Sequence, residues 1–213
     1  THVVEAGPIA RMWTTAQAKL VKESTGSSLK FTLPKASVVG FRVAEETSFE
    51  WNIPASVNAV ERIRARAYYH AYSAYVAYNM LVEAFELVRK GEAKVWTEYK
   101  RPMEGIGVGL TEAMRGALAH WCIMKDGLIH RYQVITPSAW NESPRDTLER
   151  PGPYEDAIIG TPITEKAGGE LDGIDVVRVV RSFDPCLACS VHVYDLKGEA
   201  GKVREVSPYL NLP

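Results

Sequence analysis

The sequence lacks three features, and each absence excludes a class of protein. It has no excess of positive charge, with 25 basic and 26 acidic residues, so nothing favours binding to nucleic acid or an anionic membrane surface. No apolar run approaches the roughly 20 residues that a membrane helix requires. Its three cysteines are too few, and odd in number, for a disulfide framework. With 46% hydrophobic and 24% charged residues, the composition is that of a globular protein.

The beginning of the chain also lacks two features. Thr1 stands where an initiator methionine would be, and no signal peptide follows it. We therefore expect a fragment, a processed product or one half of a split protein. Any export would then depend on a partner.

Two stretches have the periodicity of α-helices. Residues 9–23 place Met12, Ala16 and Leu20 on one stripe. A second helix is expected from a cap at Ser56 to about residue 90, where Gly91 provides a natural end. It would span roughly 50 Å, which suits a large bundle. Four tyrosines at helical spacing are expected to pack between helices: Tyr68, Tyr72, Tyr75 and Tyr78.

Shorter elements are expected elsewhere. Residues 38–43 have the character of a strand. Asp126-Gly127 separates two apolar runs and predicts a β-hairpin turn. Helices are expected over residues 154–159 and 174–182, and the second of these leads directly into Asp184-Pro185-Cys186.

The C-x-x-C formed by Cys186 and Cys189 is the strongest chemical signal, because two thiolates at this spacing can converge on nickel, iron or zinc. Alone, the pair is also compatible with a redox dithiol or with buried inert cysteines. Structural zinc needs four ligands, and only His192 lies nearby in the sequence. A zinc site would therefore require a distant residue such as His120 or Cys122.

Four segments resemble, in order, motifs of nickel–iron hydrogenase large subunits. They are EAGPIARM (5–12), RGALAHW (115–121), YQVITPSAWN followed by PRD (132–146), and SFDPCLACSVH (182–192). The last is similar to the C-terminal signature of that family. The resemblance implies the C-terminal part of a large subunit of the uptake type. Residues 1–192 would belong to its catalytic domain, and residues 193–213 would form a cleavable maturation tail.

The resemblance implies a mainly α fold: a helical bundle with small β hairpins and long irregular loops. It also implies heterolytic cleavage or formation of H2 at a nickel–iron centre whose iron carries carbon monoxide and cyanide. Cys186 would be a terminal nickel ligand and Cys189 would bridge the two metals. The family's other two cysteines lie in an R-x-C-G-x-C motif that this sequence does not contain. The N-terminal half of the large subunit must supply them.

Further roles follow from the resemblance. Arg115 would lie over the metals, preceded by Met114 where the family usually has proline. Pro137 and Ser138 would contact the cofactor, with the Ser138 hydroxyl donating to a cyanide nitrogen. Asp184 would pair with Arg115 or anchor the cysteine turn. A Cys186 thiolate is the better base for the proton of H2, since the pKa of arginine is far above working pH.

A magnesium site is also implied. His192 would bind Mg²⁺ through its imidazole, and the backbone carbonyl of Val134 would be a second ligand. His120 and His130 are expected to be structural, and Cys122 to be a small buried apolar residue. The stretch around residues 167–169 is longer than the family pattern and is expected to be a surface insertion.

The implied partners are the N-terminal half, a small subunit with iron–sulfur clusters and a maturation endopeptidase. An exported small subunit would place the complex in the periplasm or at the membrane; otherwise it would be cytoplasmic. The alternative is a non-catalytic member of the family, either an H2 sensor or an assembly protein. Both cysteines and Arg115 favour catalysis, because a scaffold has no need of them.

Overall fold

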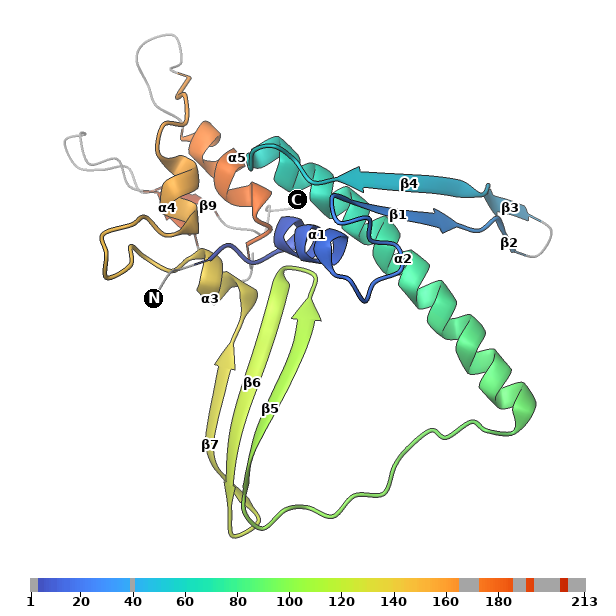
Figure 1. Cartoon of the computed structure of the whole chain (residues 1–213). Coiled ribbons are helices and arrows are strands. Elements are labelled where there is room, and N and C mark those ends of the chain that lie inside the picture. Colours follow the sequence, from blue (N-terminus) through green and yellow to red (C-terminus); the bar gives the residue numbers. More distant parts are fainter. Residues whose placement is uncertain (1–3, 39–40, 165–172, 186–190, 194–203, 207–213) are drawn as a thin grey trace, which may run out of the picture.

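The computed structural model describes residues 4–38, 41–164, 173–185, 191–193 and 204–206. Short runs of strands and of helices follow one another in this part of the chain (Figure 1). The helices are α1 (Pro8–Gln17), α2 (Ala59–Lys90), α3 (Pro137–Asn141), α4 (Pro153–Ile158) and α5 (Ile174–Ser182). The strands are β1 (Ser28–Leu33), β2 (Ala36–Val38), β3 (Phe41–Ala44), β4 (Thr47–Asn52), β5 (Gly105–Ala113), β6 (Gly116–Lys125), β7 (Leu128–Ile135), β8 (Val191–Val193) and β9 (Arg204–Val206). The expected mainly α character is not confirmed, because strands form a large share of the described chain.

The main hydrophobic core lies between α1, the β1–β4 hairpin and the first half of α2. β1 and β4 pair antiparallel with Leu29 opposite Trp51, and both side chains are completely buried. The face of α1 that carries Met12 and Ala16 closes this core. Because alternate residues of a strand share one face, the hairpin presents its apolar face to the two helices and its polar face outward.

The first helix is shorter than the sequence predicts. α1 ends at Gln17 because Ala18 adopts an extended conformation. The carbonyl of Ala16 then accepts hydrogen bonds from the Ser24 hydroxyl and the Gly26 amide, instead of continuing the helix. Leu20 is fully exposed, so the prediction that it shares the stripe of Met12 and Ala16 was wrong. The strand expected over residues 38–43 corresponds to parts of β2 and β3, which pair as a second hairpin.

The long helix is confirmed, with a corrected start. Asn58 is its N-cap, accepting a 3.0 Å hydrogen bond from the Glu61 amide, and it takes the place expected for Ser56. The helix ends at Gly91 in the left-handed conformation, as predicted. Its tyrosines follow the prediction in part. Tyr72 lies in the core cluster that also contains Met12 and Ala16 of α1. Tyr72 and Tyr75 also contact Phe31 of the hairpin, and Tyr78 is exposed.

A three-stranded antiparallel sheet, β5-β6-β7, extends away from the core (Figure 1). The predicted hairpin turn is confirmed, since β6 and β7 meet with Lys125 opposite Leu128. Asp126 and Gly127 both have positive φ, as this kind of turn requires. At the other end of the sheet, Ala113 pairs with Gly116, so the two residues between them, Met114 and Arg115, form the β5–β6 turn.

The C-terminal elements follow the sequence closely. α5 has the predicted bounds, and α4 begins one residue earlier and ends one residue earlier than predicted. β8 pairs antiparallel with β9, which places His192 opposite Glu205. Within the described part of the chain, no helix is both long enough and apolar enough to cross a membrane.

Candidate functional site

Arg115 owes its position to two glycines that meet backbone to backbone. A Cβ on Gly116 would lie 2.5 Å from the amide nitrogen of Gly7, and a Cβ on Gly7 would lie 3.4 Å from the carbonyl oxygen of Arg115. Both glycines have positive φ, which side chains of other residues rarely permit. The β5–β6 turn therefore packs directly on the chain that begins α1. A larger residue at position 116 would push Arg115 away.

The side chain of half-buried Arg115 points toward the end of the segment that precedes the cysteines. Its Nε donates a hydrogen bond of 3.4 Å to the carbonyl oxygen of Pro185. The two residues are 70 apart in the sequence. The resemblance placed Arg115 beside the cysteine motif, and this contact brings Arg115 next to the residue that directly precedes Cys186.

The segment with Pro137 and Ser138 forms α3, which is tied to the same place. Asn141 is buried, and its side chain makes two hydrogen bonds with Ala6. Its Oδ1 accepts from the Ala6 amide at 2.8 Å, and its Nδ2 donates to the Ala6 carbonyl at 2.7 Å. Pro137 is buried at the first turn of α3, and Ser138 is half-buried beside it. The described structure therefore holds α3 against the same chain that supports Arg115.

A buried arginine connects α2 to the end of α5. Arg62 is 8% exposed and forms a bidentate ion pair with Glu5, with hydrogen bonds of 2.7 and 2.9 Å. The flat face of its guanidinium lies 3.8 Å from the ring centroid of Phe183. Such a stacked cation supplies both packing and electrostatic attraction. Glu5, Arg62 and Phe183 thus join three segments that are distant in the sequence.

One helical turn later, Arg66 contacts the last residues of α5. Its Nη2 donates to the carbonyl of Ser182 at 2.9 Å and to that of Arg181 at 3.3 Å. Its Nε lies 3.8 Å from Oδ2 of Asp184. Asp184 therefore forms an ion pair with Arg66, where the resemblance implied either an ion pair with Arg115 or an anchoring role in the cysteine turn. Asp184 has φ +61, an uncommon conformation for a residue other than glycine.

Two ionisable groups near this junction have raised pKa values. Burial raises the pKa of Tyr154 far above its usual range, and the negative charges of Glu142 and Asp184 add to the shift. Burial alone raises the pKa of Glu142. The Tyr154 ring packs on Phe183 at 4.8 Å between centroids, and its buried hydroxyl has no partner among the described residues. Tyr154 is thus a neutral phenol that supports Phe183.

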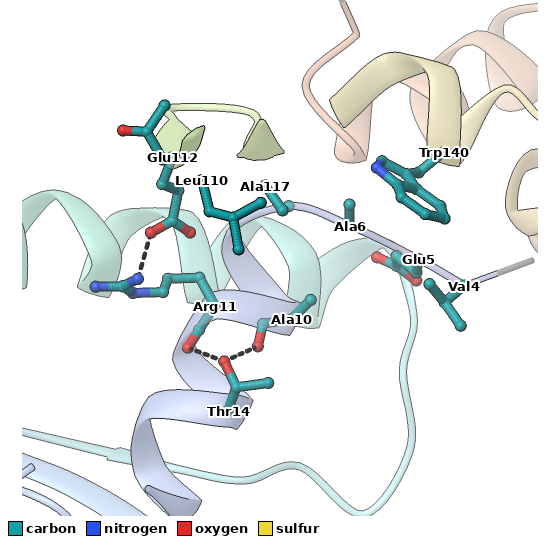
Figure 2. Close-up of a pocket in the computed structure, with 12 residues that line it drawn as sticks. Val4, Glu5, Ala6, Ala10, Arg11, Thr14, Leu110, Glu112, Ala117 and Trp140 are labelled. Atoms are coloured by element: carbon teal, nitrogen blue, oxygen red, sulfur yellow. Dashed lines mark hydrogen bonds and ion pairs between the residues drawn. The ribbon is translucent and has the colours of Figure 1, made fainter. Parts of the chain in front are cut away.

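A cavity of about 670 Å³ lies beside the start of α1, and Gly7 is one of its lining residues (Figure 2). It is lined by residues of α1, the chain before it, the β5–β6 hairpin and Trp140. Arg11 and Glu112 form a close ion pair across its wall. Burial raises the pKa of Glu112, and the adjacent Arg11 partly opposes the shift. Arg115, Pro137 and Ser138 do not line this cavity, so it is separate from the residues that the resemblance implicates.

The predicted metal ligands are only partly described. Cys186 and Cys189 lie outside the described residues. His192 is described as the central residue of β8, where it pairs with Glu205. Val134 lies in β7 opposite His120, and its carbonyl accepts a 3.2 Å hydrogen bond from the Gln133 side chain. In the described ranges, no group of three or more histidine, cysteine or acidic residues is arranged to hold a metal ion.

The donor chemistry fits one part of a nickel–iron centre. The sequence places two soft thiolates directly after the Pro185 carbonyl that Arg115 contacts, and thiolates are good ligands for nickel and iron. Two thiolates do not complete the four that the family's centre requires. The residues of this chain therefore fit a shared site.

Sequence reasoning missed Arg62 and Arg66. A signal was present, because positions 62, 65, 66, 69 and 72 fall on one face of a helix, and two arginines four residues apart occupy an otherwise apolar or aromatic stripe. A buried arginine needs partners, so such a pair predicts carboxylates or free carbonyls opposite it. Which carboxylates and carbonyls these are depends on tertiary structure.

Comparison with known proteins identifies the fold and then the family. An actinobacterial-type NiFe-hydrogenase from Ralstonia eutropha H16 superposes with a TM-score of 0.79 and 46% identity, over 88% of this chain and 34% of that chain. The [NiFeSe]-hydrogenase of Dm. baculatum gives 0.54 and 28% over the same shares. The described structure thus has the fold of part of a hydrogenase large subunit.

The sequence relatives agree. The nickel-dependent hydrogenase family matches residues 1–192. The large chain of hydrogenase-2 from Escherichia coli K12 is 33% identical over 197 residues, which are 92% of this chain and 32% of that protein. An uptake hydrogenase large subunit from Bradyrhizobium diazoefficiens is 32% identical over 211 residues. This chain belongs to the nickel-dependent hydrogenase family. It spans about a third of the length of these relatives.

Proposed function

We propose that this chain is the C-terminal part of a nickel–iron hydrogenase large subunit and contributes Cys186 and Cys189 to the metal centre that cleaves or forms H2. The observation that carries the proposal is the contact between Arg115 and Pro185, which brings a cation from a distant hairpin to the residue before Cys186. The relatives named as hydrogenase large chains and uptake hydrogenase large subunits support the same reaction.

When bound, the nickel–iron pair supplies the two-electron acceptor for heterolytic cleavage of H2. The Sγ of Cys186 takes the proton, because a thiolate can be protonated at working pH and a guanidinium cannot accept a further proton. Arg115 keeps its charge and orients the reacting molecule from the β5–β6 turn. Fixed cations of this kind act electrostatically without needing to rearrange during the reaction.

Other residues of the chain hold the iron's small ligands. Ser138 lies in the first turn of α3, where its hydroxyl can donate to a cyanide nitrogen, and cyanide accepts but does not donate hydrogen bonds. Pro137 is buried next to it and fixes the start of the helix. His192 and the backbone carbonyl of Val134 would hold Mg²⁺, and another part of the protein and water would supply the remaining ligands of the ion.

The rest of the large subunit covers the apolar surface that this chain leaves exposed. Several large apolar side chains on the second half of α2 and on β5–β7 are more than half exposed, including Phe85 at 72% and Ile106 at 78%. Exposed apolar surface on this scale marks a protein interface. The covering parts are the N-terminal half, which carries the missing cysteine pair, and a small subunit with iron–sulfur clusters that conduct the electrons.

The proposal is tested by metal content. The chain is co-produced with the rest of the large subunit and the small subunit, and nickel and iron per complex are measured. We expect stoichiometric nickel in the wild type and background nickel in Cys186→Ser. The matched control is Cys122→Ser, because Cys122 is a half-buried cysteine of β6 whose thiol contacts Met124 Sδ at 3.7 Å. A complex without nickel, or full nickel in Cys186→Ser, rejects the proposed function.

The residues after His192 are proposed to be a maturation tail. β9 belongs to this tail and pairs with β8, so the strand that carries His192 is joined to the tail by backbone pairing. Cleavage by an endopeptidase after His192 would release that pairing and allow the cysteine segment to close over the metals. Intact mass spectrometry of active, nickel-loaded protein tests this proposal. A mass that still includes Pro213 in fully active protein rejects it.

A further inference from the structure

The end of α5 is held by more contacts than a nine-residue surface helix requires. Its last residues lead into the cysteine segment, so their direction sets where Cys186 enters the centre. Two amides already close this end, with Phe183 N bonded to Val180 O and Asp184 N to Arg181 O, both at 3.1 Å. Asp184 then turns the chain through a left-handed conformation. A residue in that conformation persists only where its surroundings hold it.

We propose that Arg66 is a positioning residue that clamps residues 181–184 and thereby directs the segment that carries the first cysteine. One guanidinium reaches three groups there: the carbonyls of Arg181 and Ser182 and the carboxylate of Asp184. The carbonyls at a helix C-terminus have no partners within the helix and carry partial negative charge, so a cation is favoured at this place. Nη2 of Arg66 therefore satisfies carbonyls at the helix end, and its Nε, which makes no hydrogen bond, lies in ion-pair range of Asp184.

The neighbouring arginine shows why the clamp is rigid. Arg62 lies one turn earlier on α2, and it is fixed by Glu5 while it stacks on Phe183. Phe183 is 2% exposed and lies between Ser182 and Asp184, two of the three residues whose oxygens Arg66 approaches. The two arginines thus hold consecutive residues from one helix face. Lysine would not fully replace Arg66, because a single ammonium cannot donate to the two carbonyls and also lie beside Asp184, as Nη2 and Nε of the guanidinium do.

Arg64 provides a matched control on the same helix. Its Nη2 also donates to a backbone carbonyl, that of Asn52 at 3.0 Å, and it also pairs with an acidic residue, Glu61. Its partners belong to β4 and to α2 itself, so it does not contact α5. Removing Arg64 therefore removes an equivalent set of bonds without touching the cysteine segment.

The inference rests on the proposed function, and the experiment separates the two. Arg66→Met, Arg66→Lys and Arg64→Met are compared with the wild type in the assembled complex. We measure nickel per complex, the infrared stretches of the iron-bound carbon monoxide and cyanide, and amide hydrogen exchange of residues 181–185. In Arg66→Met we expect a roughly tenfold loss of nickel, with shifted or broadened stretches in the remainder. Exchange at Phe183 and Asp184 should become roughly tenfold faster.

The outcomes are distinct. Arg66→Lys should be intermediate, and Arg64→Met should keep wild-type nickel, stretches and exchange. Wild-type values of all three quantities in Arg66→Met overturn the inference while leaving the proposed function intact. If Arg66→Met does not accumulate, wild-type values in Arg66→Lys overturn it, because the fork is then unnecessary. If the wild type holds no nickel, the proposed function fails, and the exchange rates alone confirm or reject the clamp.

Discussion

Two regions of this structure differ in how many of their polar groups have partners and in how much of their apolar surface is buried. Where the β5–β6 turn, the start of α1, α3 and the end of α5 meet, glycines touch and an asparagine and two arginines find buried partners. At the outer half of α2 and along the far part of the sheet, large apolar side chains are exposed. The first region has most of its polar contacts within this chain, apart from the buried Nε atoms of Arg11 and Arg66 and the Tyr154 hydroxyl, which have no hydrogen-bond partner among the described residues. The second region leaves apolar surface uncovered. In the proposed function, the first region forms one wall of the shared metal centre.

The largest effect should come from the cation on that wall. Arg115→Lys keeps the positive charge at the β5–β6 turn but loses the planar fork, so we expect H2 turnover to fall by about 100-fold or more while nickel remains bound. Turnover and nickel content are measured on the same preparation. A fully active Arg115→Lys enzyme would remove Arg115 from the mechanism. Loss of nickel along with activity would make its role structural.

The second-largest effect should come from a substitution of Gly116, which tests whether the Gly7–Gly116 contact fixes the position of Arg115. Gly116→Ala forces a Cβ to within 2.5 Å of the Gly7 amide at a φ that alanine resists, and it should destabilise the protein by about 3 kcal/mol. Activity should fall too, because Arg115 is displaced. Gly109→Ala is the control in the same sheet, since its added Cβ would meet nothing within 4 Å. Equal losses of stability in both variants would show that the close contact is not the cause.

The two regions also differ in how well the sequence predicts them. Local chemistry predicted the elements whose ends carry clear sequence signals. These are Gly91 as the end of α2, the Asp126-Gly127 turn, and both bounds of α5. It failed where tertiary contacts decide. α1 stops early because residues 24 and 26 bond to Ala16, and the tyrosines of α2 pack on a hairpin that showed no clear sequence signal.

The same division applies to the site. Motif resemblance selected Arg115 and the segment ending in Pro185, and the structure brings them into contact. It did not select Arg66, because a helical arginine has no signature until the carbonyls opposite it are known. It left Asp184 either paired with Arg115 or anchoring the cysteine turn, and the ion pair that the structure shows is with Arg66. Which arginine contacts which oxygen depends on distances in the folded protein, and a sequence pattern does not give these distances.

A substitution in the exposed half of α2 should lower stability only when the rest of the protein is present. Phe85 is 72% exposed on the outer half of α2, so Phe85→Asp should change the stability of this chain alone by less than about 0.5 kcal/mol. In the complete protein the aspartate would be buried without a partner, and it should cost about 1–3 kcal/mol. Thermal unfolding of both forms measures the difference. Glu83→Asp on the same helix is the control, and an equally stable complete protein would contradict the proposed covering of α2.

The smallest expected effect distinguishes two ion pairs, one in each region. Arg11–Glu112 lies at the junction and is partly buried, whereas Arg89–Glu86 lies on the exposed half of α2. Burial raises the pKa of the Glu112 carboxyl, and Arg11 beside it lowers the pKa by less. The folded protein therefore binds this proton more tightly than the unfolded chain does. The contribution to stability is fully present below the unfolded pKa and is lost as pH rises through the folded pKa.

Glu112→Gln abolishes this titration and should flatten the dependence of stability on pH just above the ordinary glutamate pKa. The variant should therefore gain stability relative to the wild type as pH rises from about 4 to 7, by less than about 1 kcal/mol because water still reaches the pair. Apparent melting temperatures across that range measure the change. Glu86→Gln is the control and should give no such pH-dependent gain, since its ion pair remains in water. Parallel pH profiles for Glu112→Gln and the wild type would mean that Arg11 fully compensates the burial of Glu112.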